Sequence, residues 1–253
     1  MLIVVSPAKR LDETPARAAG GTTPALGDDA DHLARRARDL TAADLQRLMH
    51  VSPQLAATNV GRFARFGSGE GAKQAVELFA GDTYAGLEAG SLEPEEMDWA
   101  QHRLRILSGL YGMLRPRDLI APHRLEMGTR LDTDRGRNLY QFWGDRIAER
   151  LNRDAAAVGA GVLVNCASVE YFTAADRPAL GLRVVTPVFM EDREGGPRIV
   201  SFYAKKARGA MARFIIQRRL NDPGALRDFD TGGYRCRADL SQPDRPVFVR
   251  PAG

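Results

Sequence analysis

Residues 1–9 read MLIVVSPAK, and residues 161–167 read GVLVNCA. Each is a short apolar run that leaves into small and polar residues, which predicts two buried β-strands. Pro7 stands where the first strand ends and where a helix could begin. In α/β proteins, sites form beyond the carboxyl ends of strands. The polar residues after the second run, above all Asn165, Ser168 and Glu170, are therefore candidate site residues.

The rest of the chain alternates between helical and strand patterns. Apolar spacing and caps predict helices over 31–49 (a pair, the second capped by Thr41), 52–66, 94–106, 137–153 and 204–220. Strands are predicted at 182–189 and 197–203, paired as a hairpin, and at 245–250. There is no regular βαβ rhythm and no shift in composition. We therefore expect a mixed α/β (α+β) fold, with one compact domain over residues 1–253 and a surface loop at 13–30.

Composition excludes several classes of protein. The chain has 253 residues, of which 44% are hydrophobic and 27% charged, as in soluble globular proteins. No apolar run approaches the roughly 18 residues of a membrane helix, and the N-terminus lacks the basic lead of a signal peptide. The only cysteines are Cys166 and Cys236. A cytoplasmic protein with two reduced thiols and no membrane partner is the simplest interpretation.

Metal chemistry has little support in the sequence. Of the four histidines, only His123 has an acidic residue, Glu126, at short spacing. A metal site needs three or more convergent ligands. We therefore predict no metal site and no cofactor.

A basic segment gives the clearest electrostatic signal. From Ser201 to Leu220 there are six basic residues and no acidic one: Lys205, Lys206, Arg208, Arg213, Arg218 and Arg219. Cations near a helix N-terminus oppose the helix dipole, and a docked anion would relieve that cost. The alternative is a solvated basic face that pairs with the acidic stretch near Glu95.

A glycine-rich corner lies at Leu104–Pro116, LRILSGLYGMLRP. Gly109 and Gly112, flanked by helical-looking segments, resemble the turn of a helix-hairpin-helix DNA-binding motif, whose glycines let backbone N–H groups approach a phosphate. The spacing is one residue longer than usual, and Pro116 shortens the second helix. The alternative is a tight corner between helices whose glycines serve packing alone.

The segment Ser6-Pro7-Ala8-Lys9 matches the S-x-x-K pattern of penicillin-binding enzymes. The companion S-D-N and K-T-G elements are absent, so acyl-serine chemistry has weak support. An anion held by Lys9 and the amides of this turn fits better. A nucleophilic role for Cys166 would need a histidine beside it, and none is close in sequence.

Several of these stretches together resemble the peroxide-stress-resistance protein YaaA family. The resemblance rests on VSPAK (5–9), LSGLYG (107–112), RLEMG (124–128), YQFWGD (140–145), the 165–172 segment and SFYAKKARG (201–209). It implies a cytosolic bacterial protein associated with survival of hydrogen peroxide and with limiting reactive intracellular iron. It also implies DNA binding and a family-specific fold with a helix-hairpin-helix-like element, here near residues 100–120, and a positively charged cleft.

Two functions follow as hypotheses. The first is a DNA-binding protein of the peroxide response that protects DNA and lowers reactive iron. It would contact duplex or distorted DNA with little sequence specificity, through Gly109, Gly112, Arg115, Lys205, Lys206, Arg208 and Arg213. The alternative is an enzyme for a small anionic substrate, a nucleotide or phosphorylated metabolite. Its pocket would hold Ser6, Lys9, Arg124, Asn165, Ser168 and Glu170 beside the 205–208 helix. We favour the first and assign no catalytic residue.

Overall fold

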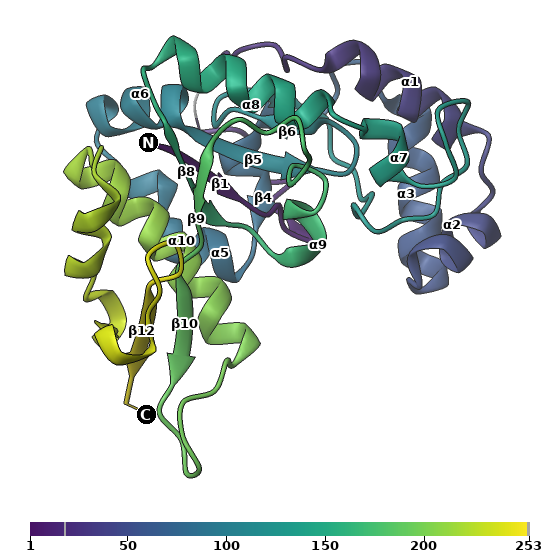
Figure 1. Ribbon diagram of the computed structural model, residues 1–253. Coiled ribbons are helices and arrows are strands. Elements are labelled where there is room, and N and C mark those ends of the chain that lie inside the picture. Colours follow the sequence, from purple (N-terminus) through teal and green to yellow (C-terminus); the bar gives the residue numbers. More distant parts are fainter. Residues whose placement is uncertain (18, 252–253) are drawn as a thin grey trace.

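The computed structural model describes residues 1–17 and 19–251, and its centre is a five-stranded sheet (Figure 1). The strand order is β6 (Gly112–Leu114), β5 (Leu104–Ser108), β1 (Leu2–Val5), β8 (Val162–Cys166) and β9 (Arg183–Val185). Strand β1 runs parallel to β5 and β8, β9 runs parallel to β8, and β6 is antiparallel to β5. Because Val5 pairs with Cys166, β1 and β8 end at the same level, whereas β5 continues past Ile106 to Ser108.

Helices cover both faces of this sheet. In Figure 1, α6 (Pro94–Arg103) and α8 (Arg146–Ala157) lie on one side, and α5 (Asp82–Leu87) and α10 (Ser201–Arg218) lie on the other. Helices α5 and α10 cross very closely, because each has a glycine at the crossing. A Cβ added at Gly86 would overlap the carbonyl oxygen of Lys206, and one at Gly209 would overlap that of Thr83. The crossing fixes α10 against the start of α5.

The remaining elements are further helices and three small sheets. The helices are α1 (Gly27–Arg38), α2 (Ala42–Met49), α3 (Pro53–Arg65), α4 (Ala75–Leu78), α7 (Leu139–Trp143) and α9 (Val169–Phe172). The short 3₁₀ helices are η1 (Ala89–Ser91), η2 (Pro223–Asp228), η3 (Thr231–Gly233) and η4 (Ala238–Leu240). Three small sheets pair β2 (Arg10–Leu11) with β4 (Phe79–Ala80), β3 (Lys73–Gln74) with β7 (Leu119–Ile120), and β10 (Val188–Glu191) with β12 (Val247–Arg250) and β11 (Arg235–Cys236).

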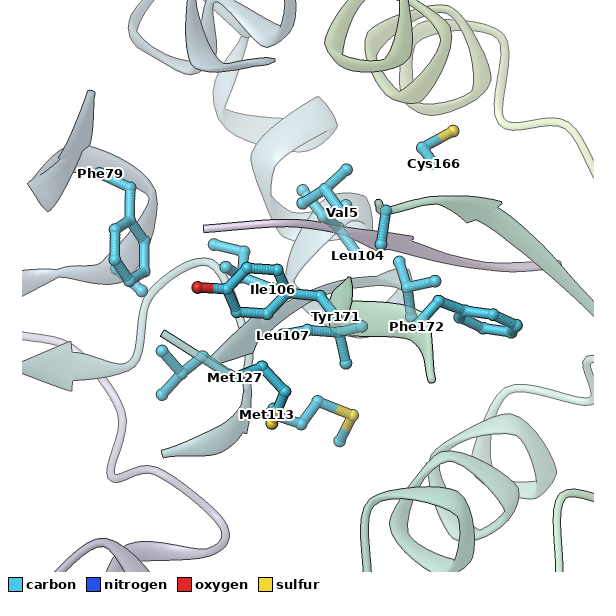
Figure 2. Close-up of a cluster of buried hydrophobic side chains, with 14 of the residues drawn as sticks. Val5, Phe79, Leu104, Ile106, Leu107, Met113, Met127, Cys166, Tyr171 and Phe172 are labelled. Carbon is cyan, nitrogen blue, oxygen red and sulfur yellow. The ribbon is translucent and has the colours of Figure 1, made fainter. Parts of the chain in front are cut away.

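One continuous hydrophobic cluster runs from Met1 to Phe248. Figure 2 shows part of it around the ends of the central strands, where Tyr171 and Phe172 from α9 point to different sides. Strand β1 is completely buried, as a strand with neighbours on both edges and helices on both faces must be. The mixed α/β class predicted from the sequence is confirmed, as are the strands at β1, β8 and β12 and the helices α3 and α10.

The predicted helix-hairpin-helix element near residues 100–120 is wrong. Helix α6 ends at Arg103, and the chain then forms the antiparallel pair β5–β6, with Gly112 at φ +66° in the turn. Leu104–Ser108 is buried along its whole length between β1 and β6. Pairing with β1, which lies a hundred residues away, overrides the local helical pattern. Helices α2 and α3, joined through the left-handed His50, form a helical hairpin elsewhere in the fold.

Three other boundaries differ from the sequence prediction. The predicted 182–203 hairpin is reduced to one antiparallel bridge, between Glu191 and Arg198, because β10 pairs in parallel with β12 and α10 already begins at Ser201. The predicted 137–153 helix is two helices, separated at Gly144 with φ +50°. The 13–30 loop is shorter than predicted because α1 begins at Gly27; residue 18 lies outside the described residues.

Candidate functional site

A cavity of about 490 Å³ opens where β1 and β8 end, and we call it the strand-end pocket. The segment after β1, the start of α5, the β8–α9 turn and the first turns of α10 form its walls. Its polar lining residues are Ser6, Lys9, Arg10, Asp82, Thr83, Ser168, Glu170, Lys205 and Arg208. The volume lies within the range of about 300–1,000 Å³ that is typical of small-molecule sites. Four cations and two carboxylates line it, which leaves two positive charges in excess.

Two serines join the strand ends. The backbone N–H of Ser168 donates to Oγ of Ser6 at 2.8 Å, and Oγ of Ser6 lies 3.3 Å from Oγ of Ser168. The hydroxyl of Tyr84 donates to the carbonyl of Ser6 at 3.2 Å. Ser6 therefore positions the β8–α9 turn, and the hydroxyl of Ser168 lies at the pocket wall.

Of the four cations that line the pocket, Arg208 has the least favourable surroundings for its charge. It is half-buried, and burial lowers the pKa of its guanidinium, an effect opposed only by the nearby Cys166. Within the described part of the chain, no carboxylate lies within ion-pair distance of Arg208 or Lys205. A desolvated cation without a counter-ion is costly, so an anion in the pocket would stabilise this arrangement.

The predicted Lys9 and Arg124 share one carboxylate. Lys9 Nζ lies 2.9 Å from Glu126 Oε2, and the Arg124 guanidinium donates to Glu126 Oε1 at 2.8 Å. Arg124 does not line the strand-end pocket; it borders a small adjoining hollow that Lys9, Ser108 and His123 also line. Glu126 therefore restrains Lys9 at the rim.

Glu170 borders two cavities. Its Oε1 accepts from the N–H of Gly128 at 3.0 Å, and no hydrogen bond from the described residues reaches Oε2. It lines the strand-end pocket and also a second hollow of about 320 Å³, which Arg47, His50 and Arg130 border. One carboxylate oxygen of Glu170 is thus free to accept a hydrogen bond from a ligand.

Cys166 lines the pocket and Asn165 lies beside it, and neither is an activated nucleophile. Burial raises the pKa of the Cys166 thiol to about 12, so it stays protonated at neutral pH and is a poor nucleophile. Figure 2 shows this side chain among the buried hydrophobic side chains of the core. Asn165 does not line the pocket; its Oδ1 accepts from the N–H of Ala167 at 2.9 Å and holds the turn.

Several lining residues were not predicted from the sequence. Arg10, Asp82 and Thr83 carry no motif of their own, and they reach the pocket because β2 and the start of α5 fold over it. Tyr171 also lines the pocket, and it lies in the 165–172 segment quoted for the family resemblance. Over residues 1–17 and 19–251, no three His, Cys, Asp or Glu side chains converge as a metal site would require. In the same residues, no helix is both long and apolar enough to cross a membrane.

Comparison with known proteins identifies the family. A family model described as peroxide stress protein YaaA matches residues 1–240. The chain belongs to the YaaA peroxide stress family. It is 61% identical over 254 residues to a UPF0246 protein of Ruegeria pomeroyi and 63% identical over 255 residues to one of Cereibacter sphaeroides, with 99% of each chain covered. A third UPF0246 protein, from Dinoroseobacter shibae, is 58% identical over 99% of this chain and 95% of its own.

Two of the DNA contacts predicted from the YaaA resemblance fall on buried glycines. Gly109 and Gly112 are buried: a Cβ at Gly109 would overlap the carbonyl of Leu125, and one at Gly112 would press on the ring of Trp143. The two glycines therefore allow close packing, which was the alternative interpretation of this segment. Neither residue offers its backbone to a phosphate on the surface of this family member.

Two predicted arginines are engaged within the protein. Arg115 pairs with the buried Asp118 at 2.9 Å. The Arg213 guanidinium donates to the carbonyls of Leu87 and Glu88 at 3.1 and 2.8 Å, so it ties α10 to the end of α5. Lys205 and Lys206 are exposed, and Lys205 reaches the strand-end pocket. The fold thus brings together Ser6, Lys9, Ser168, Glu170, Lys205 and Arg208 around one pocket, which Gly109, Gly112 and Arg115 do not line.

Proposed function

We propose that this chain binds a small phosphate-bearing anion in the strand-end pocket, as part of the peroxide stress response in the cytoplasm. The observation that carries the proposal is Arg208, a half-buried guanidinium that faces the pocket without a carboxylate partner among the described residues. Lys205 on the same helix and the hydroxyl of Ser168 across the pocket supply further donors for phosphate oxygens. The alternative hypothesis from the sequence was an enzyme for a small anionic substrate, and the present proposal keeps that class of ligand but not the turnover.

The pocket supports binding more directly than turnover. The Cys166 thiol is protonated, and the Ser6 hydroxyl already accepts the Ser168 N–H. Lys9, the partner that S-x-x-K chemistry would need, is held by Glu126 instead. None of these groups is set up as an activated nucleophile with an adjacent base.

Isothermal titration calorimetry with ribose 5-phosphate and with adenosine 5′-monophosphate tests the proposal. We expect at least one to bind, and the Lys205→Ala/Arg208→Gln double variant to lose about tenfold or more in affinity, since each removes a charge-assisted contact. A charge-matched control, Arg35→Ala/Arg153→Ala, removes two exposed arginines from α1 and α8. If neither compound binds, or if the control loses as much affinity as the pocket variant, the proposal is wrong.

DNA binding is the second candidate. It is favoured by the exposed Lys205 and Lys206, which have no ion-pair partner in the described residues, and by the second hollow with Arg47 and Arg130 on the far side of Glu170. A nucleic-acid backbone could follow this path from α10 to the α2–α3 hairpin, through phosphate contacts with little sequence readout.

Fluorescence anisotropy with labelled duplex, mismatched and single-stranded DNA separates the two candidates. Contacts to six to ten phosphates predict a loss of about a thousandfold or more in affinity between 50 and 200 mM salt. The Lys205→Ala/Lys206→Ala variant should then bind more weakly and show a shallower salt dependence, whereas Arg35→Ala/Arg153→Ala should not. Binding that is insensitive to the lysine substitutions would remove α10 from the DNA interface.

The link to iron is proposed as indirect. Protection of DNA from iron-driven peroxide damage, or altered iron handling through the bound ligand, would connect the chain to lower reactive iron. Metal analysis of protein purified without chelators addresses this directly: stoichiometric bound iron would replace the indirect route with sequestration.

A further inference from the structure

The strand-end pocket has two chemically different ends. The α10 end carries Lys205 and Arg208, which suit an anion, whereas the α9 end carries Glu170, which repels one. Since the Gly128 N–H occupies only Oε1 of Glu170, Oε2 remains available as an acceptor, and Glu170 lines the pocket. A ligand that satisfies both ends has a phosphate at one end and an N–H donor at the other.

The pocket also offers apolar surface that suits a flat ring. Besides its charged groups, the lining includes Pro7, Ala8, Ala80 and Tyr171, which are apolar or aromatic. The volume of about 490 Å³ is far larger than an inorganic phosphate fills. Small-molecule sites commonly combine such an apolar surface with a few fixed polar groups that set orientation.

From this arrangement, and resting on the proposed function above, we infer that the ligand is a mononucleotide whose base presents an amino group to Glu170. The phosphate lies at Lys205 and Arg208, and the base lies on the apolar wall. A carboxylate accepts hydrogen bonds but does not donate them, so it selects an amino group over a carbonyl at the same position, as acidic side chains do at the amino group of cytosine.

Two matched ligand pairs test this inference by calorimetry. Cytidine and uridine 5′-monophosphates differ at one edge of the base, where cytosine has an amino group and uracil a carbonyl. Glucosamine 6-phosphate and glucose 6-phosphate differ by an amine without any base. We expect the cytidine compound to bind about tenfold more tightly than the uridine compound, the size of one charge-assisted hydrogen bond. Both sugar phosphates should bind more weakly than either nucleotide.

The Glu170→Gln variant gives the decisive comparison. Its carbonyl can still accept the Gly128 N–H, so the side chain stays in place and its NH₂ group replaces the free carboxylate oxygen. The preference should then invert toward uridine monophosphate. Glu149→Gln on α8 is the control, because Glu149 is exposed and lies outside the pocket, and it should keep the original preference.

The other outcomes separate the failure of this inference from the failure of the proposed function. Equal binding of both nucleotides, with no change in Glu170→Gln, overturns the role of Glu170 but leaves phosphate binding intact. Tighter binding of glucosamine 6-phosphate than of the nucleotides makes the ligand a phosphorylated amine, which overturns the nucleotide class. No binding of any of the four compounds contradicts the proposed function itself.

Discussion

Ser6 and Ser168 lie 162 positions apart in the chain, and the backbone N–H of Ser168 donates to Oγ of Ser6 at 2.8 Å. This bond joins the carboxyl end of β1 to the turn that begins α9. It places one wall of the strand-end pocket at a fixed distance from the other. The pocket is therefore a product of strand order: β1 and β8 are neighbours in the sheet although they are far apart in sequence.

Ser6→Ala should destabilise the protein more than Ser168→Ala. The first change leaves the Ser168 N–H without its acceptor and should lower the free energy of unfolding by about 1–3 kcal/mol, whereas the second removes only a hydroxyl contact and should cost less than about 1 kcal/mol. Urea unfolding of both variants measures this. Equal losses would mean that water replaces the Ser6 hydroxyl.

Gly209→Ala should destabilise the fold, although alanine is the better helix former by about 1 kcal/mol. The added Cβ would overlap the carbonyl oxygen of Thr83 and force α10 away from α5, at a cost of about 1–3 kcal/mol. Gly61→Ala in α3 is the matched control, because Gly61 also lies inside a helix and a Cβ there meets only the end of the Arg65 side chain, at 3.5 Å. Thermal unfolding should show a lower midpoint for Gly209→Ala alone; a stabilised Gly209→Ala would contradict the close crossing.

Stability should fall on mild acidification because of His123. Burial lowers the pKa of this histidine from 6.5 to about 4, and its Nδ1–H donates to the carbonyl of Ala121 at 2.9 Å. The folded state therefore holds neutral imidazole, while the unfolded chain takes up a proton below pH 6.5. The stabilisation, about 3 kcal/mol at most, is complete above pH 6.5 and is lost as pH falls toward 4.

Urea unfolding between pH 7.5 and 4.5 measures the effect of His123. His123→Gln should flatten the decline in this window, whereas His102→Gln, at an exposed position, should keep it. Identical pH profiles for His123→Gln and the parent would show that other groups cause the acid sensitivity.

Arg250→Met should be among the most destabilising surface-accessible changes. Arg250 Nε donates to both oxygens of Glu191, at 2.7 and 2.8 Å, and only 1% of the Glu191 side chain is exposed. Removal of the guanidinium leaves a buried charge with only the Tyr234 hydroxyl as donor, which should cost about 3–5 kcal/mol. Arg237→Met breaks an exposed pair with Asp239 and should cost less than about 1 kcal/mol. Chemical denaturation of the two variants should separate them clearly.

Cys166 should resist oxidation and alkylation. With a thiol pKa of about 12, on the order of one molecule in ten thousand carries the thiolate at pH 8. Iodoacetamide labelling followed by mass spectrometry measures this in two single-cysteine variants. Cys166 in the Cys236→Ser variant should be labelled at least tenfold more slowly than Cys236 in the Cys166→Ser variant. Rapid modification of Cys166 by peroxide would instead give this thiol a sensing role.

The local sequence pattern was sufficient to predict those elements whose structure depends on one short segment alone. The apolar runs at β1 and β8 and the long α10 were predicted from the sequence, and the Thr41–Asp44 capping box forms at α2. These elements depend on hydrophobic periodicity, caps and turn residues, which act over a few positions. Ser6, Lys9, Ser168 and Glu170 were identifiable for the same reason: they directly follow recognisable strands.

Only the tertiary structure determines how segments that are far apart in the sequence pair and pack against one another. Leu104–Ser108 became a strand because β1 offered an unpaired edge, and that pairing buried Gly109 and Gly112. Asp82 and Thr83 entered the pocket because glycines let α5 and α10 cross closely. The sequence determined the strands β1, β8 and β12, the basic helix α10 and the family. Long-range strand pairing and helix packing decided which side chains surround the pocket, because contacts between distant segments leave no local pattern.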